Sequence, residues 1–133
     1  MYAISENGVI TMFRGDCVAL EVSMPVYDAA SEPTGENYEM QEGDVLTLTV
    51  RRAPGREYPV LMQVVSATAR LLITPGDTRD MEPGEYSADI ELRRADGSVD
   101  TIYPLLENLT PRARKKTVNW KNFIITGEVT ADD

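Results

Sequence analysis

Apolar residues recur at every second position in several stretches of this chain, and the clearest case is residues 85–93. The apolar set on one face of that stretch is Tyr86, Ala88, Ile90 and Leu92. The residues between them are charged or small and polar. A period of two is typical of a β-strand with one face in the core, whereas an amphipathic helix repeats about every 3.6 residues. The alternation therefore predicts a half-buried strand rather than a helix.

Further alternating or β-branched runs follow at the short intervals that are typical of β-sandwiches. The other predicted strands are residues 9–13, 17–24, 44–52, 59–67, 69–74, 98–103 and 122–130. Turn-forming residues fill 28–37, 52–56 and 75–84. Asp96-Gly97 lies between two predicted strands, and this dipeptide predicts a tight type I′ hairpin turn. We therefore predict an all-β chain, an antiparallel β-sandwich of about seven to nine strands, in a single domain over residues 1–133; the resemblances described below imply that this sandwich is immunoglobulin-like.

Composition narrows the functions that the chain can have. Its 133 residues include 22 Asp+Glu against 13 Lys+Arg, no histidine and a single cysteine, Cys17. The chain therefore lacks the commonest general base and zinc ligand, and it cannot form an internal disulfide. No stretch approaches the roughly 18 apolar residues of a membrane-spanning helix. Residues 1–8 carry no basic residue, so we also expect no secretory signal peptide.

Carboxylate pairs are the remaining candidates for acid–base catalysis, as in glycoside hydrolysis. With 22 acids in 133 residues, some carboxylates always lie close together, so such pairs give no specific signal. Cys17 and the serines have no imidazole partner that could activate them as nucleophiles. We predict that the chain is not an enzyme and that it has no catalytic residues, metal ligands or cofactor.

Gly84 and Tyr86 stand at the start of the predicted strand 85–93. Their spacing is similar to the tyrosine corner of immunoglobulin-like sandwiches, in which the ring packs inside and the hydroxyl bonds to upstream backbone. Ala88 stands where antibody domains carry a cysteine, so the predicted sandwich has no disulfide bridge. A role of Tyr86 in binding is the alternative to this structural role.

The turn-rich stretch 75–82 is acidic and allows two interpretations. Asp77, Asp80 and Glu82 could supply carboxylate oxygens to a calcium ion. Alternatively, Asp77 caps a single helical turn that crosses between the two sheets. The spacing of the three acids favours the cap, because it matches no calcium-binding loop.

Charge is segregated along the chain. The candidate partner-contact residues are Arg112, Arg114, Lys115, Lys116, Trp120 and Lys121, in an extended basic loop at 104–121. Five of them are basic, and residues 111–121 contain no acidic residue, so the rest of the chain has eight basic and 22 acidic residues. A solvated loop, a contact with an acidic neighbouring subunit and a contact with nucleic acid all remain open. The acidic remainder disfavours nucleic acid, because it repels a polyanion within the screening length of about 8 Å.

Three segments, in this order, resemble the immunoglobulin-like β-sandwich proteins of tailed phages and prophages, in particular the N-terminal domain of baseplate upper proteins. The segments are Phe13-Arg14-Gly15-Asp16 before a strand, residues 73–78 followed by 82–92, and Asp96-Gly97 leading to 122–130. The stretch 104–119 is longer than the usual link in that family. The resemblance implies a non-enzymatic structural component of the tail or baseplate. It also implies location in the virion after assembly in the bacterial cytoplasm, with other phage structural proteins or copies of the chain as partners.

A carbohydrate-binding or other ligand-binding sandwich module is the alternative from another functional class. Such modules place several aromatic rings on one exposed face. Here Tyr86, Tyr103 and Phe123 are predicted to point inward. The remaining candidates, Tyr27, Tyr38, Tyr58 and Trp120, stand in different segments. The distribution of aromatic residues therefore favours protein–protein contacts over sugar binding.

Overall fold

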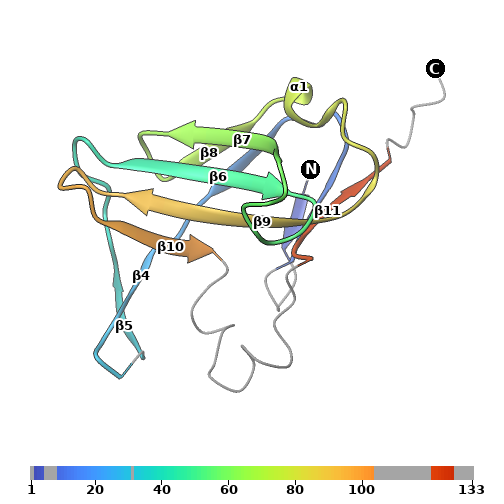
Figure 1. The fold of residues 1–133 in the computed structure, drawn as a ribbon. Helices are drawn as coiled ribbons and strands as arrows, with labels where there is room; N and C mark the ends of the chain where they lie inside the picture. Colours follow the sequence, from blue (N-terminus) through green and yellow to red (C-terminus); the bar gives the residue numbers. More distant parts are fainter. Residues whose placement is uncertain (1, 5–8, 31, 104–120, 128–133) are drawn as a thin grey trace.

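The computed structural model describes residues 2–4, 9–30, 32–103 and 121–127. These residues form eleven β-strands and one short helix, which confirms the all-β prediction but exceeds the predicted seven to nine strands (Figure 1). The strands are β1 (Tyr2–Ile4), β2 (Ile10–Phe13), β3 (Val18–Glu21), β4 (Pro25–Tyr27), β5 (Pro33–Asn37), β6 (Val45–Arg51), β7 (Val60–Ser66), β8 (Arg70–Ile73), β9 (Gly84–Arg93), β10 (Val99–Tyr103) and β11 (Phe123–Thr126). The helix, α1, spans Pro75–Thr78.

Most of the strands lie in two sheets that face each other. The larger sheet has the order β1-β2-β11-β9-β6-β7, with β10 also paired to β9. The smaller sheet consists of β3 and β8, while β4 and β5 form a separate ribbon that projects downward in Figure 1. Every described pair is antiparallel except β2 with β11. The architecture is therefore the predicted antiparallel sandwich.

One strand position in the larger sheet is occupied by two separate strands. β10 pairs with residues 90–93 of β9, and β11 pairs with residues 84–86 of the same strand. Since β6 occupies the other edge of β9, β10 and β11 share one edge. In immunoglobulin-like sandwiches a single strand takes this place. The link between β10 and β11 is thus an insertion at the middle of a strand.

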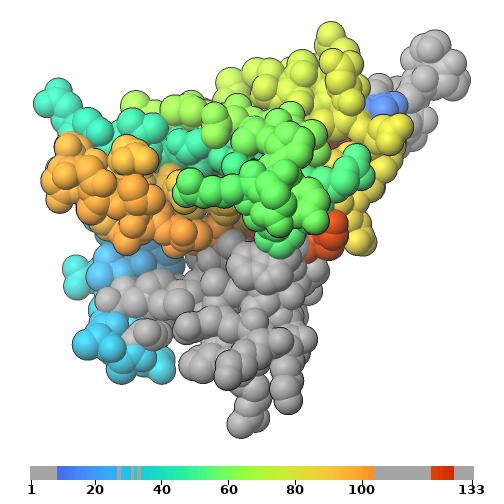
Figure 2. All heavy atoms as spheres, in the orientation of Figure 1, coloured from blue at the N-terminus to red at the C-terminus, as the bar shows by residue number. Residues whose placement is uncertain are grey.

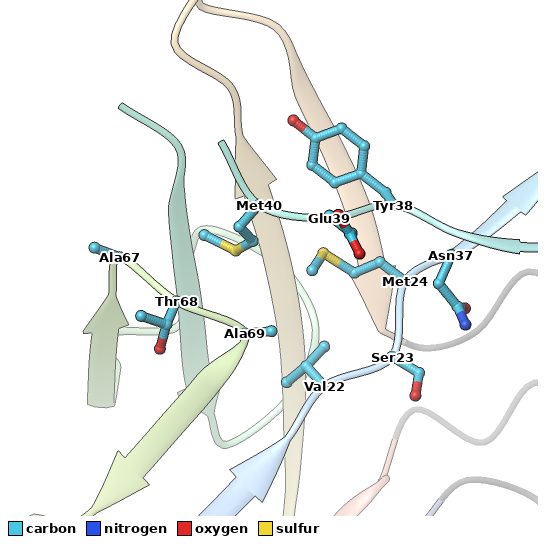
Figure 3. Close-up of a pocket in the computed structure, with 10 residues that line it drawn as sticks. All are labelled: Val22, Ser23, Met24, Asn37, Tyr38, Glu39, Met40, Ala67, Thr68 and Ala69. Atoms are coloured by element: carbon cyan, nitrogen blue, oxygen red, sulfur yellow. The ribbon is translucent and has the colours of Figure 1, made fainter. Parts of the chain in front are cut away.

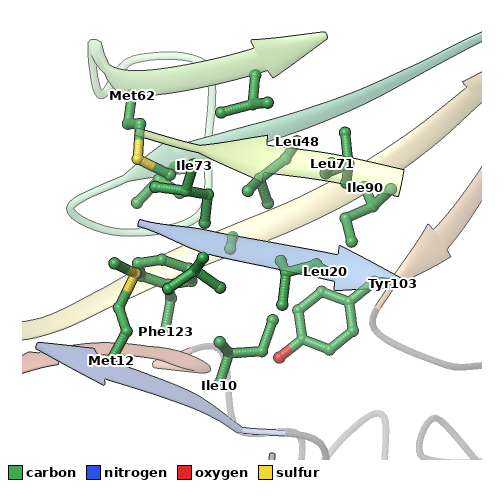
Figure 4. Packing of buried hydrophobic residues seen from close by; sticks show 14 of the residues in the cluster. Ile10, Met12, Leu20, Leu48, Met62, Leu71, Ile73, Ile90, Tyr103 and Phe123 are labelled. Carbon is green, nitrogen blue, oxygen red and sulfur yellow. The ribbon is translucent and has the colours of Figure 1, made fainter. Parts of the chain in front are cut away.

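The hydrophobic core lies between the two sheets (Figure 4). β6 shows the predicted alternation clearly, because Leu46, Leu48 and Val50 are fully buried. Leu71 and Ile73 of β8 are equally buried on the opposite sheet. Burial of each such side chain contributes about 1.5–3 kcal/mol. Packing across the two sheets is therefore the main source of stability for this fold.

The sequence did not predict β1, β4 or β5, and β5 lies in the stretch 28–37 that was predicted as a turn. β5 consists of Pro, Thr, Gly, Glu and Asn, most of which are depleted in strands. Its pairing with β4 holds it extended. Asp28 closes the turn between them, since its Oδ1 accepts hydrogen bonds from the N–H groups of Ala30 and Glu32 at 2.9 and 3.0 Å. Pairing and local hydrogen bonds therefore override the strand propensities here.

The hairpin between β9 and β10 is present, but its turn differs from the predicted type I′. Arg94 N–H donates to the carbonyl of Ser98 at 2.8 Å, and Gly97 N–H donates to the carbonyl of Arg94 at 2.9 Å. Gly97 has a φ of 93°. This pattern is a three-residue loop, in which a type I turn is followed by a left-handed residue that forms a bulge. The glycine was identified correctly, whereas the loop length was wrong by one residue.

Candidate interaction surfaces

The predicted contact residues lie in or directly after the insertion between β10 and β11. Arg112, Arg114, Lys115, Lys116 and Trp120 fall outside the described residues. Lys121 is described, and its Nζ donates a 2.7 Å hydrogen bond to the main-chain carbonyl of Arg52. This bond connects the start of β11 to the end of β6. Lys121 therefore lies at the base of the insertion, and its contact with a partner stays a prediction.

Asn122, which precedes β11, is hydrogen-bonded both to β9 and to Tyr103 at the end of β10. Its Oδ1 accepts from the N–H of Ala88 at 2.7 Å, and its Nδ2 donates to the carbonyl of Ala88 at 3.0 Å. Its own carbonyl accepts from the hydroxyl of Tyr103 and from the N–H of Ile10, both at 2.9 Å. Burial raises the pKa of the Tyr103 phenol, which keeps this hydroxyl protonated as a donor. Sequence reasoning missed Asn122, whose one signal was an amide side chain directly before an apolar strand.

Tyr86 has the contacts of a tyrosine corner. Its ring is buried, and its hydroxyl donates to the main-chain carbonyl of Glu82, four residues upstream. Gly84 begins β9 between these two residues. The guanidinium of Arg52 lies 5.6 Å from the centroid of the Tyr86 ring. Because the side chain is only 2% exposed, the ring packs in the core and presents no surface to a ligand.

The acidic turn before β9 is organised by a capping box. Thr74 precedes α1, and its N–H and hydroxyl both donate to Oδ2 of Asp77, at 2.7 and 3.0 Å. Asp77 therefore caps the helical turn as the reciprocal partner of Thr74, which is itself the N-cap residue. Asp80 and Glu82 follow α1 in the chain, and both are exposed to solvent. The carboxylate of Asp77 is thus engaged in a structural role, as the cap interpretation predicts.

Asp44 connects the link before β6 to the β9–β10 hairpin. Its Oδ2 accepts from the hydroxyl of Tyr38 at 2.5 Å and from the N–H of Gln41 at 2.8 Å, and its Oδ1 accepts from the N–H of Ala95 at 3.1 Å. The Arg94 guanidinium stacks 4.9 Å from the centroid of the Tyr38 ring. The hydrogen bond from Tyr38, followed by that from Gln41, lowers the pKa of Asp44. The carboxylate therefore stays ionised and joins two loops.

Asp89 is half-buried on the outer face of β9, beside a small cavity of about 80 Å³ under residues 53–55. Burial raises the pKa of its carboxyl, and the neighbouring Glu91 raises it further. Arg51 on the adjacent strand partly offsets this effect. The outer face of the larger sheet therefore carries both signs of charge close together.

A groove of about 440 Å³ opens at the end of the sandwich (Figure 3). Three segments line it: the link from β3 to β4, the link from β5 to β6, and the turn from β7 to β8. Its apolar lining comes from Val22, Met24, Met40, Ala67 and Ala69. Methionine side chains adapt their shape to different partners. The groove has the size and lining to receive an apolar side chain.

β7 is an edge strand of the larger sheet, where it pairs only with β6 among the described strands. Its inward residues, Met62 and Val64, are buried in the core. Its outward residues Leu61 and Val65 are 39% and 61% exposed. The strand lies along the upper part of the molecule in Figures 1 and 2. An open edge with exposed apolar side chains is a typical site for pairing with another chain.

The described aromatic side chains do not form a sugar-binding platform. Tyr86, Tyr103 and Phe123 are buried, as predicted. Tyr58 is 38% exposed on the loop before β7, and the Tyr38 ring faces Arg94 instead. A sugar-stacking face requires several exposed rings together, so the described surface fits the carbohydrate-binding alternative poorly.

Within residues 2–4, 9–30, 32–103 and 121–127, no group of three or more His, Cys, Asp or Glu side chains is arranged to hold a metal ion. The described part of the chain also contains no helix with the length and apolar character needed to span a membrane. No known family, curated protein or solved structure matches this chain.

Proposed function

We propose that this chain is a non-enzymatic structural component of a phage or prophage particle, in the tail or baseplate, where it makes protein–protein contacts. The open edge of β7 carries this proposal, because an exposed and apolar strand edge is suited to pairing with another polypeptide. The resemblance of the sequence segments to phage immunoglobulin-like domains supports the same role. The basic segment 112–121, which holds five of the 13 basic residues, is the second proposed contact surface and is opposite in charge to the rest of the chain.

The electrostatics of the chain support this role over nucleic-acid binding. The net charge is −9, so the molecule as a whole repels a polyanion. Basic residues concentrated in one segment can meet an acidic surface of a neighbouring protein. Contacts of this kind weaken as salt rises, because exposed charge pairs are screened.

The proposal is tested in the host that carries the coding sequence. Particles are induced, purified on a density gradient and analysed by quantitative mass spectrometry. We expect the chain to co-sediment with the tail proteins at a fixed copy number per particle. A chain that stays entirely in the soluble lysate while intact particles form would refute the proposal.

A further inference from the structure

Only part of β7 has a regular strand geometry without a bulge. Residues 62–66 pair with residues 46–50 of β6 without interruption. Leu61 interrupts the register before them, since Met62 pairs with Val50 and Val60 pairs with Arg51. α1 contacts β7 and lies near its start in Figure 1. The bulge and the helix therefore confine the regular free edge to residues 62–66.

β7 combines the absence of charge with a length that the other uncharged edge strands, β1 and β4 with three residues each, do not reach. It has seven residues and none of them is charged, in a chain whose net charge is −9. β3 and β8, the two strands of the smaller sheet, carry Glu21 and Arg70 at their paired ends, 3.6 Å apart. Natural edge strands commonly carry a charged residue, often Lys, that prevents pairing with another chain. β7 has no such residue, so its edge is not protected in this way.

We propose that β7 pairs in antiparallel fashion with β7 of a second copy of this chain, about a twofold axis at Val64. Val64 is the middle residue of the regular segment, so an axis there uses all five residues in both copies. Two copies with a charge of −9 repel each other over most of their surfaces. Pairing at an uncharged strand brings no like charges into direct opposition.

The side chains around this axis are complementary to themselves. Gln63 lies opposite Val65 of the partner subunit on the outer face, and Val64 meets its own symmetry mate on the inner face. β-branched residues paired across antiparallel strands stabilise a sheet. The pairing joins the two larger sheets into one continuous sheet. This inference rests on the proposed contact function, because it names a second copy as one of the partners.

The test places like charges across the axis. The double variant Gln63→Lys/Val65→Lys changes two exposed, outward side chains, so the hydrophobic core is untouched and the one described bond that is lost is the 3.2 Å hydrogen bond from Gln63 Nε2 to Thr49 Oγ1. In the dimer each new lysine lies opposite a lysine of the partner. Sedimentation is measured from about 1 µM to about 1 mM, the range in which weak complexes dissociate. We expect the unaltered chain to dimerise within this range and the variant to dimerise at least about tenfold more weakly.

A complementary variant tests the register. Gln63→Glu/Val65→Glu also places like charges across the axis, so alone it is expected to be monomeric. Mixed with the lysine variant, it places each glutamate opposite a lysine, and we expect a mixed dimer to form. Failure of the mixture to dimerise would overturn the proposed register.

The control carries the same change in charge elsewhere. Val26→Lys/Val99→Lys alters residues that are 39% and 43% exposed on β4 and β10, away from β7 in Figure 1. We expect this variant to dimerise like the unaltered chain, and circular dichroism verifies that every variant is folded. An unaltered chain that is monomeric throughout, or a control that dissociates equally, overturns the inference. The gradient experiment on particles decides the proposed function separately.

Discussion

Replacement of Asn122 by alanine tests whether the side chain of this residue holds the split strand together. The change removes the two hydrogen bonds to Ala88 and leaves a buried N–H and a buried carbonyl without partners. Each such group costs about 1–3 kcal/mol, so we expect a loss of about 2–4 kcal/mol after some relaxation. With an m-value of about 1.5 kcal/mol per M, the midpoint of urea unfolding falls by roughly 1.3–2.7 M.

The matched control is Asn37→Ala, which makes the same chemical change at an exposed position on β5. Its effect should stay within about 0.5 kcal/mol, as for most surface substitutions. Both variants are followed by circular dichroism at the wavelength of the β-sheet signal. If Asn122→Ala lowers the midpoint no more than the control does, the inference that the Asn122 side chain holds the split strand to β9 is wrong.

Three further changes test the local structure. Tyr86→Phe removes the hydrogen bond to Glu82 and should cost about 1 kcal/mol, seen as a fall of about 3–5 °C in Tm by calorimetry. Asp44→Asn should lower stability at neutral pH. The pKa of Asp44 is lower in the folded state, so the ionised carboxylate stabilises the unaltered chain at neutral pH and this stabilisation is lost as pH falls below about 4. The urea midpoints of the unaltered chain and of Asp44→Asn should therefore converge in acid. Gly97→Ala places a Cβ at a φ of 93° and should cost about 1–2 kcal/mol by urea unfolding, whereas Gly76→Ala, which meets nothing within 4 Å, should cost far less. Equal effects of the two glycine changes would contradict the assigned turn.

The strands with a clear alternation were predictable from the sequence because one face of each must be buried. Leu46, Leu48 and Val50 illustrate this, since their period of two fixes which side of β6 enters the core. β5 was not predictable, because its extended form depends on pairing with β4 rather than on apolar residues. The hairpin loop was half predictable: Gly97 marks the turn, but the dipeptide alone does not set the loop length.

The candidate surfaces also include some features that the sequence shows and others that depend on the fold. The basic segment is visible in the sequence, because charge clustering needs no knowledge of the fold. The role of Asn122 is not visible, since its partner, Ala88, is 34 residues away in the chain. The open edge of β7 is likewise a property of sheet order, which a single sequence does not reveal. Long-range pairing is therefore the part of this molecule that sequence patterns miss.

The position of the insertion has a consequence for how its length affects the stability of the fold. Tyr103 and Asn122 are hydrogen-bonded to each other, and Asn122 is also hydrogen-bonded to Ala88 of β9, so these bonds connect β10, β11 and β9 where the chain leaves and re-enters the sheet. Doubling the length of a loop between fixed ends costs only about 0.6 kcal/mol. Lengthening the chain between Tyr103 and Asn122 is therefore expected to lower the stability of the framework by less than about 1 kcal/mol.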